Sequence, residues 1–319
     1  MELSRADILY FLQEPSNEVF KVADKIRKEN VGDTVHLRGL IEFSNYCSKN
    51  CLYCGIRSAN KEAKRYRLSE EEILKYSKNA VELGLKTIVL QSGEDNYYNV
   101  DKMVSIIRGI KKHDVVLTLS IGEKSAEEYK AYKDAGADRF LMRIETTDKE
   151  LYKKMHPNSN YEKRVEALKE IKRLGFETGT GCLVGLPGQT IESLADDILF
   201  FKEIGADMVG IGPFISNSQT PLKDSPNGNF ELALKVMALT RIMLPKANIP
   251  ATTAMETIHP NGRILALKCG ANVVMPNMTD YDINKNYELY KNKVSNNKGI
   301  DETLKDIKDK IISLNRTPL

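Results

Sequence analysis

The sequence predicts an α/β fold, a (β/α)8 TIM-type barrel with short helical extensions at its amino and carboxyl ends. Eight short runs rich in β-branched residues recur along the chain, and amphipathic stretches with helical spacing separate them. Alternating strands and helices form a parallel sheet, eight strands close a barrel, and the interval matches the ~250 residues usual for that fold. The eight runs are 35–43, 87–92, 115–120, 139–145, 178–185, 208–215, 249–255 and 271–276.

Local signals support the predicted helices between these runs. Ser69 and Ser125 each stand three residues before a glutamate, which is the capping-box pattern that begins a helix. Apolar residues within 191–201 recur at helical spacing. Four predicted helices are each followed by a glycine, the residue that most often ends a helix: Gly84, Gly136, Gly175 and Gly205. We therefore expect a helical extension (1–34), a barrel (35–280) and a helical tail (281–319).

The composition excludes several classes of protein. The 319 residues include 47 Lys and Arg against 44 Asp and Glu, and this balance gives no reason to expect a nucleic-acid partner. No apolar stretch approaches the ~18 residues of a membrane span. The charged first 30 residues lack the apolar region of a signal peptide. We therefore expect a soluble, cytoplasmic globular protein.

Three of the five cysteines, Cys47, Cys51 and Cys54, lie within eight positions, directly after the first predicted strand. Their C-x3-C-x2-C spacing lets three thiolates bind three irons of a four-iron, four-sulfur cluster, and no fourth cysteine lies nearby. The remaining iron can then bind S-adenosylmethionine (SAM), whose reductive cleavage is chemistry of the cofactor. The alternative is a structural zinc site, although zinc normally takes four ligands. Cys182 and Cys269 are isolated, and we expect them to be buried.

The C-x3-C-x2-C loop, with the aromatic Tyr53 before its last cysteine, is the mark of the radical SAM superfamily, which this sequence resembles. Within it, the chain most resembles the HydE family, the maturases of FeFe-hydrogenase, from about residue 17 to about 290. Biotin synthase and methylornithine synthase are related but match less well. The segments on which the resemblance rests are 36–57, 86–95, 177–190, 207–215, 248–255 and 269–277.

The resemblance implies a set of SAM-binding residues. Backbone oxygens of the segment Ser92, Gly93 and Glu94 would receive the amino group of SAM, and Tyr53 would pack on its adenine. Taken alone, Arg164 would be a solvated charge on a helix, and Met208 would be a core residue. The other SAM-binding residues that the resemblance implies are Glu145, Arg164, Met208 and Tyr287.

The resemblance also implies a cavity that binds an anionic substrate. Its residues would be Gln91, Thr118, Arg143, Thr252, Thr253 and Met275. Arg143 and Glu145 stand two apart on one predicted strand, so both side chains point into the barrel, where they could instead form a structural ion pair. Threonines also pack in strands by default. Thr252 and Thr253 are consecutive, so both can face the cavity only where the strand ends or bulges.

The function that the resemblance implies is that of an oxygen-sensitive maturase. A 5′-deoxyadenosyl radical from SAM would attack the sulfur of a cysteine-bound iron carbonyl-cyanide precursor of the hydrogenase H-cluster. HydG and HydF would be partner maturases, and an external donor would supply the electron. Residues 280–319 contain no cysteine, so we expect one cluster and no accessory cluster. Two alternatives stay open: a mutase of the methylornithine synthase type acting on an amino acid, and a non-catalytic iron–sulfur carrier or scaffold.

Overall fold

The computed structural model describes residues 2–16, 18–295 and 299–319. Among them, no helix is both long and apolar enough to cross a membrane. The helices are α1 (Arg5–Gln13), α2 (Glu18–Val31), α3 (Glu70–Glu82), α4 (Val100–Ile110), α5 (Ala126–Asp134), α6 (Lys149–Met155), α7 (Tyr161–Arg173), α8 (Ile191–Glu203), α9 (Phe230–Met243), α10 (Thr253–Ile258), α11 (Gly262–Lys268), α12 (Tyr281–Asn284) and α13 (Ile300–Ile312). The strands are β1 (Thr34–Leu37), β2 (Gly39–Ser44), β3 (Thr87–Ser92), β4 (Val116–Ser120), β5 (Arg139–Leu141), β6 (Glu177–Val184), β7 (Met208–Pro213), β8 (Val273–Val274) and β9 (Thr317–Pro318).

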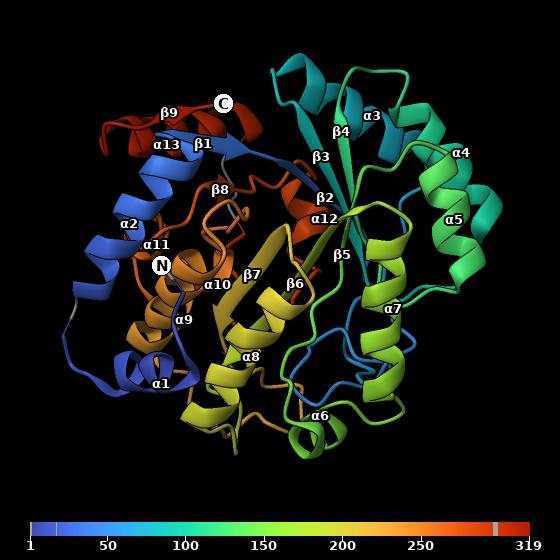
Figure 1. Cartoon of the computed structure of the whole chain (residues 1–319). Coiled ribbons are helices and arrows are strands. Elements are labelled where there is room, and N and C mark those ends of the chain that lie inside the picture. The colour runs from blue at the N-terminus through green and yellow to red at the C-terminus, as the bar shows by residue number, and fades with distance from the viewer. Residues whose placement is uncertain (1, 17, 296–298) are drawn as a thin grey trace.

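The strands form a parallel barrel-like arrangement that the helices surround (Figure 1). The main sheet has six parallel strands in the order β2-β3-β4-β5-β6-β7, and a smaller sheet has the order β8-β1-β9. Isolated bridges join the two sheets into a ring: Leu40 with Asn277, Met208 with Asn248, and Pro250 with Val273. The predicted α/β fold of the TIM-barrel type is confirmed.

Several strand predictions differ from the structure. The run 249–255 was expected to be a strand, but it makes only isolated bridges, and helix α10 begins within it at Thr253. Pro250 has no N–H to donate to a ladder, and Thr252 already has the backbone conformation of a helix N-cap. The run 139–145 ends as a strand at Leu141. The strand therefore ends four residues before its predicted end. Glu145 still makes an isolated bridge to Cys182, but its φ of 68° lies outside the range of regular strands.

The predicted helix signals are confirmed. Ser69 and Ser125 each accept a hydrogen bond from the backbone N–H of the glutamate three residues on, and that glutamate bonds back to the serine. The four glycines predicted to end helices all have positive φ, which lets them adopt the left-handed conformation of a helix end. β9 was not predicted; it pairs with β1 in the register Thr34 to Thr317.

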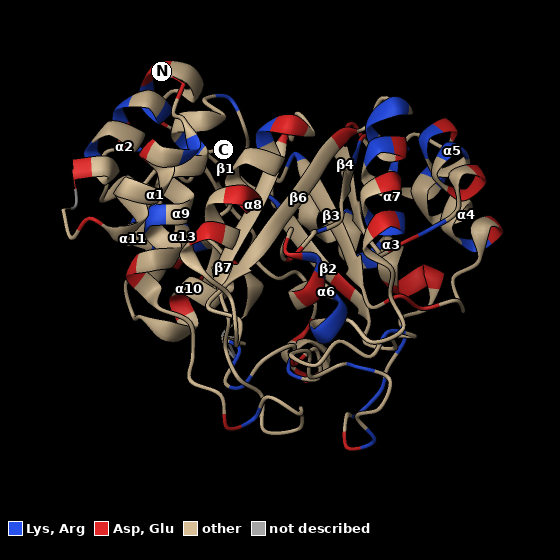
Figure 2. Ribbon diagram, turned by 60° about the horizontal axis from the view of Figure 1, so that its bottom comes forward, with Lys and Arg blue, Asp and Glu red and all other residues tan. Residues whose placement is uncertain are grey.

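Alternate strand residues face two different environments, as the pleat of a strand requires. One set, which includes Ile41, Leu90 and Leu119, belongs to the apolar core between the strands and the helices. The strands are accordingly almost free of charge in Figure 2, and the charged residues gather on the helices and loops. The other set faces the barrel interior and is partly polar: Arg38, Glu42, Gln91, Thr118, Arg139 and Arg143. Three of the polar residues predicted for the site, Gln91, Thr118 and Arg143, belong to this interior set.

Arg241 fastens α9 to the segments that complete the ring. It is fully buried, and its guanidinium donates hydrogen bonds to the carbonyl oxygens of Gly270 and Pro245, each at 2.8 Å. It also donates to the Asn272 side-chain oxygen at 2.9 Å, and that oxygen accepts a second bond from the Ile249 N–H. The Arg241 side chain thus connects the end of α9, the segment that follows α9 and the segment that precedes β8.

Arg241→Ala should lower the free energy of unfolding by about 3 kcal/mol, because it leaves buried carbonyl oxygens without donors. Urea denaturation of the purified protein at constant pH measures this change. Arg108→Ala, at an exposed position of α4, is the matched control and should change the free energy by less than ~0.5 kcal/mol. Similar losses in both variants would contradict the role given to Arg241.

Candidate active site

The three predicted cluster cysteines lie on the loop that follows β2, and all three are partly buried. Arg65 holds this loop by donating hydrogen bonds to four of its carbonyl oxygens. The acceptors are the carbonyls of Asn45, Ile56, Arg57 and Asn60. Sequence reasoning missed Arg65, because nothing in its local sequence shows that it binds backbone several residues away.

The segment after β3 packs closely against the cysteine loop. A Cβ atom at Gly93 would overlap the carbonyl oxygen of Tyr46 and lie 2.7 Å from the Cβ of Cys47. The Glu94 N–H is 3.4 Å from the Cys47 sulfur, and the Ser48 N–H donates to the Glu94 carbonyl at 2.9 Å. Only glycine permits this close approach, so the packing alone requires glycine at position 93, whether or not a ligand binds.

Tyr53, between the second and third cysteines, is fixed by His156. The Nδ1 of His156 is 2.9 Å from the Tyr152 carbonyl oxygen, which can only accept, so Nδ1 carries the proton. Burial lowers the pKa of His156 to about 4, so the ring is neutral near pH 7 and Nε2 accepts. The Tyr53 hydroxyl therefore donates to Nε2, at 2.7 Å. The Leu52 N–H donates to the Met155 carbonyl at 2.9 Å, a second bond between the loop and the end of α6.

The thiols need a positive partner in order to ionise. Burial raises the pKa of Cys47 and Cys54, and raises that of Cys51 to about 12 with a further contribution from Cys47. Bound metal reverses this effect, because a coordinating thiol loses its proton. Within the described part of the chain, no three His, Cys, Asp or Glu side chains are arranged to hold one metal ion. A cluster presents a separate iron to each thiolate, so this spacing fits a cluster better than zinc.

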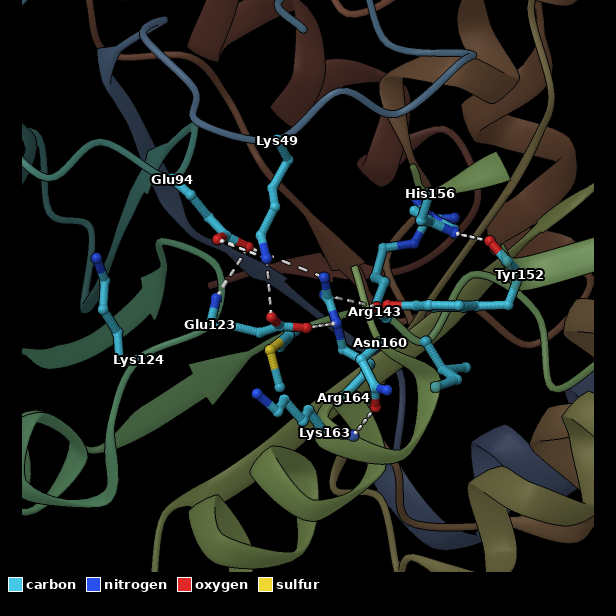
Figure 3. Close-up of polar contacts among 12 residues, drawn as sticks. Lys49, Glu94, Glu123, Lys124, Arg143, Tyr152, His156, Asn160, Lys163 and Arg164 are labelled. Atoms are coloured by element: carbon cyan, nitrogen blue, oxygen red, sulfur yellow. Dashed lines mark hydrogen bonds and ion pairs between the residues drawn. The ribbon is translucent and has the colours of Figure 1, made fainter. Parts of the chain in front are cut away.

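Four charged side chains, each less than 20% exposed, form a network beside the cysteine loop (Figure 3). The Lys49 ammonium is 3.0 Å from Glu123 and 3.5 Å from Glu94. Arg164 reaches the same two carboxylates, at 2.5 Å to Glu123 and 3.9 Å to Glu94. The side chain of Arg164 is 11% exposed, so the interpretation of this residue as a solvated surface charge is wrong. The network joins the cysteine loop, the ends of β3 and β4, and α7.

Charge pairing sets the protonation states in this network. Burial alone would raise the pKa of Glu123, but Arg164 and Lys49 lower it, so this carboxylate is ionised. Burial outweighs the same cations at Glu94 and raises its pKa. Lys49 and Glu123 were not among the predicted site residues. Their positions in the sequence could have indicated site residues, because Lys49 lies between two of the cysteines and Glu123 closely follows β4.

Arg143 and Glu145 form the ion pair that the sequence left as an alternative, with 3.0 Å between nitrogen and oxygen. The pair does not satisfy both groups. Arg143 Nε and the buried Thr118 hydroxyl have no hydrogen-bond partner among the described residues, whereas Glu145 Oε2 is the oxygen that pairs with Arg143. Gly210 lies beside Arg143. A Cβ atom added at Gly210 would be 3.8 Å from the Cδ of Arg143. Unpaired buried polar groups are uncommon, so Arg143 Nε and the Thr118 hydroxyl are candidate contacts for a polar ligand.

The predicted threonines lie where the extended chain ends, so the condition for both to face one cavity is met. Thr252 is the N-cap residue of α10, and its hydroxyl donates to the Ile211 carbonyl at 3.3 Å. The Thr253 hydroxyl accepts from Arg263 at 3.4 Å. Gln91 and Ser92 end β3, which places Gln91 on the interior face.

The segment after α12 brings Tyr287 to the cysteine loop. Tyr287 is buried, and its pKa is raised by burial and by Glu42, with smaller effects from Cys54 and Cys47. The Gly55 N–H donates to the Leu289 carbonyl at 2.7 Å, which fixes this segment on the loop.

The two predicted methionines lie at different ends of their strands. Met208 begins β7, at the opposite end from the cysteine loop, and its sulfur accepts from buried Arg38 at 3.2 Å. Met275 follows β8 directly. The ligand contacts given to both methionines stay predictions.

Comparison with known proteins agrees with this geometry. Residues 41–201 match the family model of the Radical SAM superfamily. The chain therefore belongs to the radical SAM superfamily, whose members are SAM-dependent enzymes that contain a four-iron, four-sulfur cluster.

The relatives narrow this assignment. The chain is 55% identical to the [FeFe] hydrogenase maturase subunit HydE of Thermotoga maritima, over 86% of this chain and 79% of that protein. Within the superfamily it belongs to the HydE family. It is 32% identical to the 3-methylornithine synthase of Methanosarcina acetivorans, over 82% of this chain and 75% of that protein. The crystal structure of methylornithine synthase (PylB) has a TM-score of 0.87 and 26% identity, covering 100% of this chain and 95% of the other.

Gly93→Ala should reduce the iron bound after anaerobic reconstitution, because the added methyl group displaces the cysteine loop at a cost of about 1–3 kcal/mol. Iron per chain and the visible absorption of the cluster measure the effect. Gly299→Ala is the control, because an added Cβ there meets nothing within 4 Å. Equal iron contents in the two variants would show that the close approach at Gly93 is unnecessary.

A double-mutant cycle tests the bond between Tyr53 and His156. Tyr53→Phe and His156→Phe should each destabilise the protein, and the double variant should lose about 1–2 kcal/mol less than the sum, because the two share one buried hydrogen bond. Urea denaturation of the four proteins gives this coupling energy. If the losses of the two single variants add up to the loss of the double variant to within ~0.5 kcal/mol, the hydrogen bond is contradicted.

Proposed function

We propose that this chain is a cytoplasmic radical SAM maturase of the HydE type, with a single cluster held by Cys47, Cys51 and Cys54. One observation supports this most directly: the three thiols lie on a strand-end loop fixed beside an interior that contains unpaired polar atoms. When bound, the cluster and SAM supply the one-electron cleavage of a carbon–sulfur bond that produces a 5′-deoxyadenosyl radical. The tail contains no cysteine for a second cluster.

Most of the proposed SAM-binding residues lie beside the cysteine loop, and Met208 is the exception. Arg164 would pair with the carboxylate of SAM, as a guanidinium does in bidentate geometry, while Glu123, which also pairs with Lys49, holds its side chain in place. Glu145, whose carboxylate pairs with Arg143 in the structure, would be a further contact. The segment Ser92–Glu94 would present backbone oxygens to the amino group. The other proposed contacts are Tyr53, Met208 and Tyr287.

The proposed substrate is an anionic, cysteine-bound iron carbonyl-cyanide precursor of the H-cluster, on whose sulfur the radical would act. Arg143 Nε and the Thr118 hydroxyl are unpaired groups suited to bind an anion inside the barrel. Further contacts are proposed for Gln91, Thr252, Thr253 and Met275. The identity with the Thermotoga maritima maturase supports this substrate. We further propose that HydG supplies this precursor, that HydF receives the product, and that an external donor provides the electron.

A second candidate is an amino-acid mutase of the methylornithine synthase type. The fold similarity and the 32% identity favour it over other radical SAM reactions, and the interior guanidinium of Arg143 would also suit a carboxylate. Identification of the organic product formed from candidate amino acids, in the presence of SAM and reductant, separates the two functions.

The cysteine assignment is tested by 5′-deoxyadenosine formation in anaerobically reconstituted protein, reduced with dithionite and supplied with SAM. Cys47→Ser should lower this product by at least ~100-fold, since even residues that only support metal ligands typically account for roughly 10–100-fold. Cys182→Ser is the control; Cys182 is fully buried in the apolar core, and its replacement should leave product formation largely intact. Equal losses would contradict the ligand assignment.

A further inference from the structure

The segment 57–67, between the cysteine loop and α3, concentrates positive charge. It contains five cationic residues and a single acidic residue, a larger excess than the +3 of the whole chain. Lys61 and Lys64 are exposed and, among the described residues, form no ion pair. The cations of this segment are Arg57, Lys61, Lys64, Arg65 and Arg67. A surface of this kind attracts an acidic partner.

This basic segment lies directly on the outer side of the cysteine loop. The Ser58 N–H donates to the Lys49 carbonyl at 2.8 Å, and the Tyr66 N–H donates to the Asn45 side chain at 2.8 Å. Arg65 adds bonds to the Asn45 and Ile56 carbonyls of the loop. A partner bound to the segment would therefore lie next to the loop that carries the thiols.

Two exposed aromatic rings extend this surface. The side chains of Tyr46 and Tyr97 are 37% and 51% exposed. The guanidinium carbon of Arg67 is 3.7 Å from the centre of the Tyr46 ring and 4.8 Å from that of Tyr97, and the Lys102 ammonium is 3.4 Å from the Tyr97 ring. Tyrosine and arginine are enriched in protein interfaces.

The surface is also held rigid before any partner binds. Asp95 is buried and accepts two bonds from Arg67, at 2.7 and 2.9 Å, so the guanidinium keeps its place between the rings. Less side-chain freedom is then lost on binding. Tyr46 immediately precedes Cys47, so the exposed ring is one residue from a proposed cluster ligand.

We propose that Tyr46, Tyr97 and the segment 57–67 form the docking surface for an acidic, low-potential one-electron carrier protein. This inference rests on the proposed function, in which the cluster must receive one electron from outside for each SAM cleaved. In the docked pair the carrier loses one electron and the cluster gains one, and no bond forms or breaks. Charge attraction would chiefly accelerate association, so the effect should depend on ionic strength.

Stopped-flow measurement of cluster reduction, without SAM, tests the docking surface. The reductants are an acidic ferredoxin, reduced beforehand and freed of excess reductant, and dithionite, which needs no docking surface. The variant Lys61→Glu/Lys64→Glu should be reduced by the ferredoxin about tenfold more slowly at low salt, and the wild-type rate should fall as salt rises. Dithionite should reduce all proteins at one rate.

The matched control is Lys21→Glu/Lys305→Glu, which makes the same charge change at exposed positions of α2 and α13. Figure 1 shows these helices away from the loop that lies beside α6. Equal ferredoxin rates in the two double variants, or a wild-type rate unaffected by salt, would overturn the docking surface.

Two other outcomes are also decisive. If dithionite fails to reduce the wild-type protein, the cluster assignment itself fails, and the docking surface fails with it. If it reduces the wild type but not Lys61→Glu/Lys64→Glu, the loop is damaged, and Lys102→Glu on α4 decides instead. A slower ferredoxin rate in Lys102→Glu supports the proposal, and an unchanged rate overturns it.

Discussion

The close contact between the cysteine loop and the end of β3 is the constraint on which the rest of the site depends. It exists because Gly93 has no side chain and because Arg65 binds the carbonyl oxygens that the irregular loop leaves unpaired. A loop with three nearby thiols would otherwise be free to move. The two residues convert a flexible connection into a fixed edge of the barrel, against which α6 and the segment after α12 also pack.

The buried charges around this edge are arranged so that none stands alone. Lys49 and Arg164 share Glu94 and Glu123, and burial of such groups is tolerable only when they are paired. The sharing also has a geometric result. Arg164 reaches from the outer helix α7 to the edge of the barrel, and Lys49 of the cysteine loop lies beside it. Four elements far apart in the sequence thus become one unit.

Much of this molecule was predictable from local patterns. Strand and helix order followed from periodicity, the capping boxes at Ser69 and Ser125 have the expected bonds, and the cysteine spacing located the site. What was missed depends on distant contacts. Arg65 and Glu123 have partners that only the folded chain brings near, and run 249–255 looked like a strand because its composition says nothing of the helix that begins within it. Arg164 looked like a surface residue because one helix sequence does not show which face meets a neighbour.

The backbone of Glu145 has a consequence for the evolution and engineering of this protein. A non-glycine residue at a φ of 68° carries roughly 1–3 kcal/mol of conformational strain, which glycine at the same place would relieve. Glycine would also remove the carboxylate that faces the barrel interior. The relief of strain would therefore be offset, because the Arg143 guanidinium would be left without its charged partner. Attempts to make the enzyme more robust should hold this position fixed and seek their gains elsewhere.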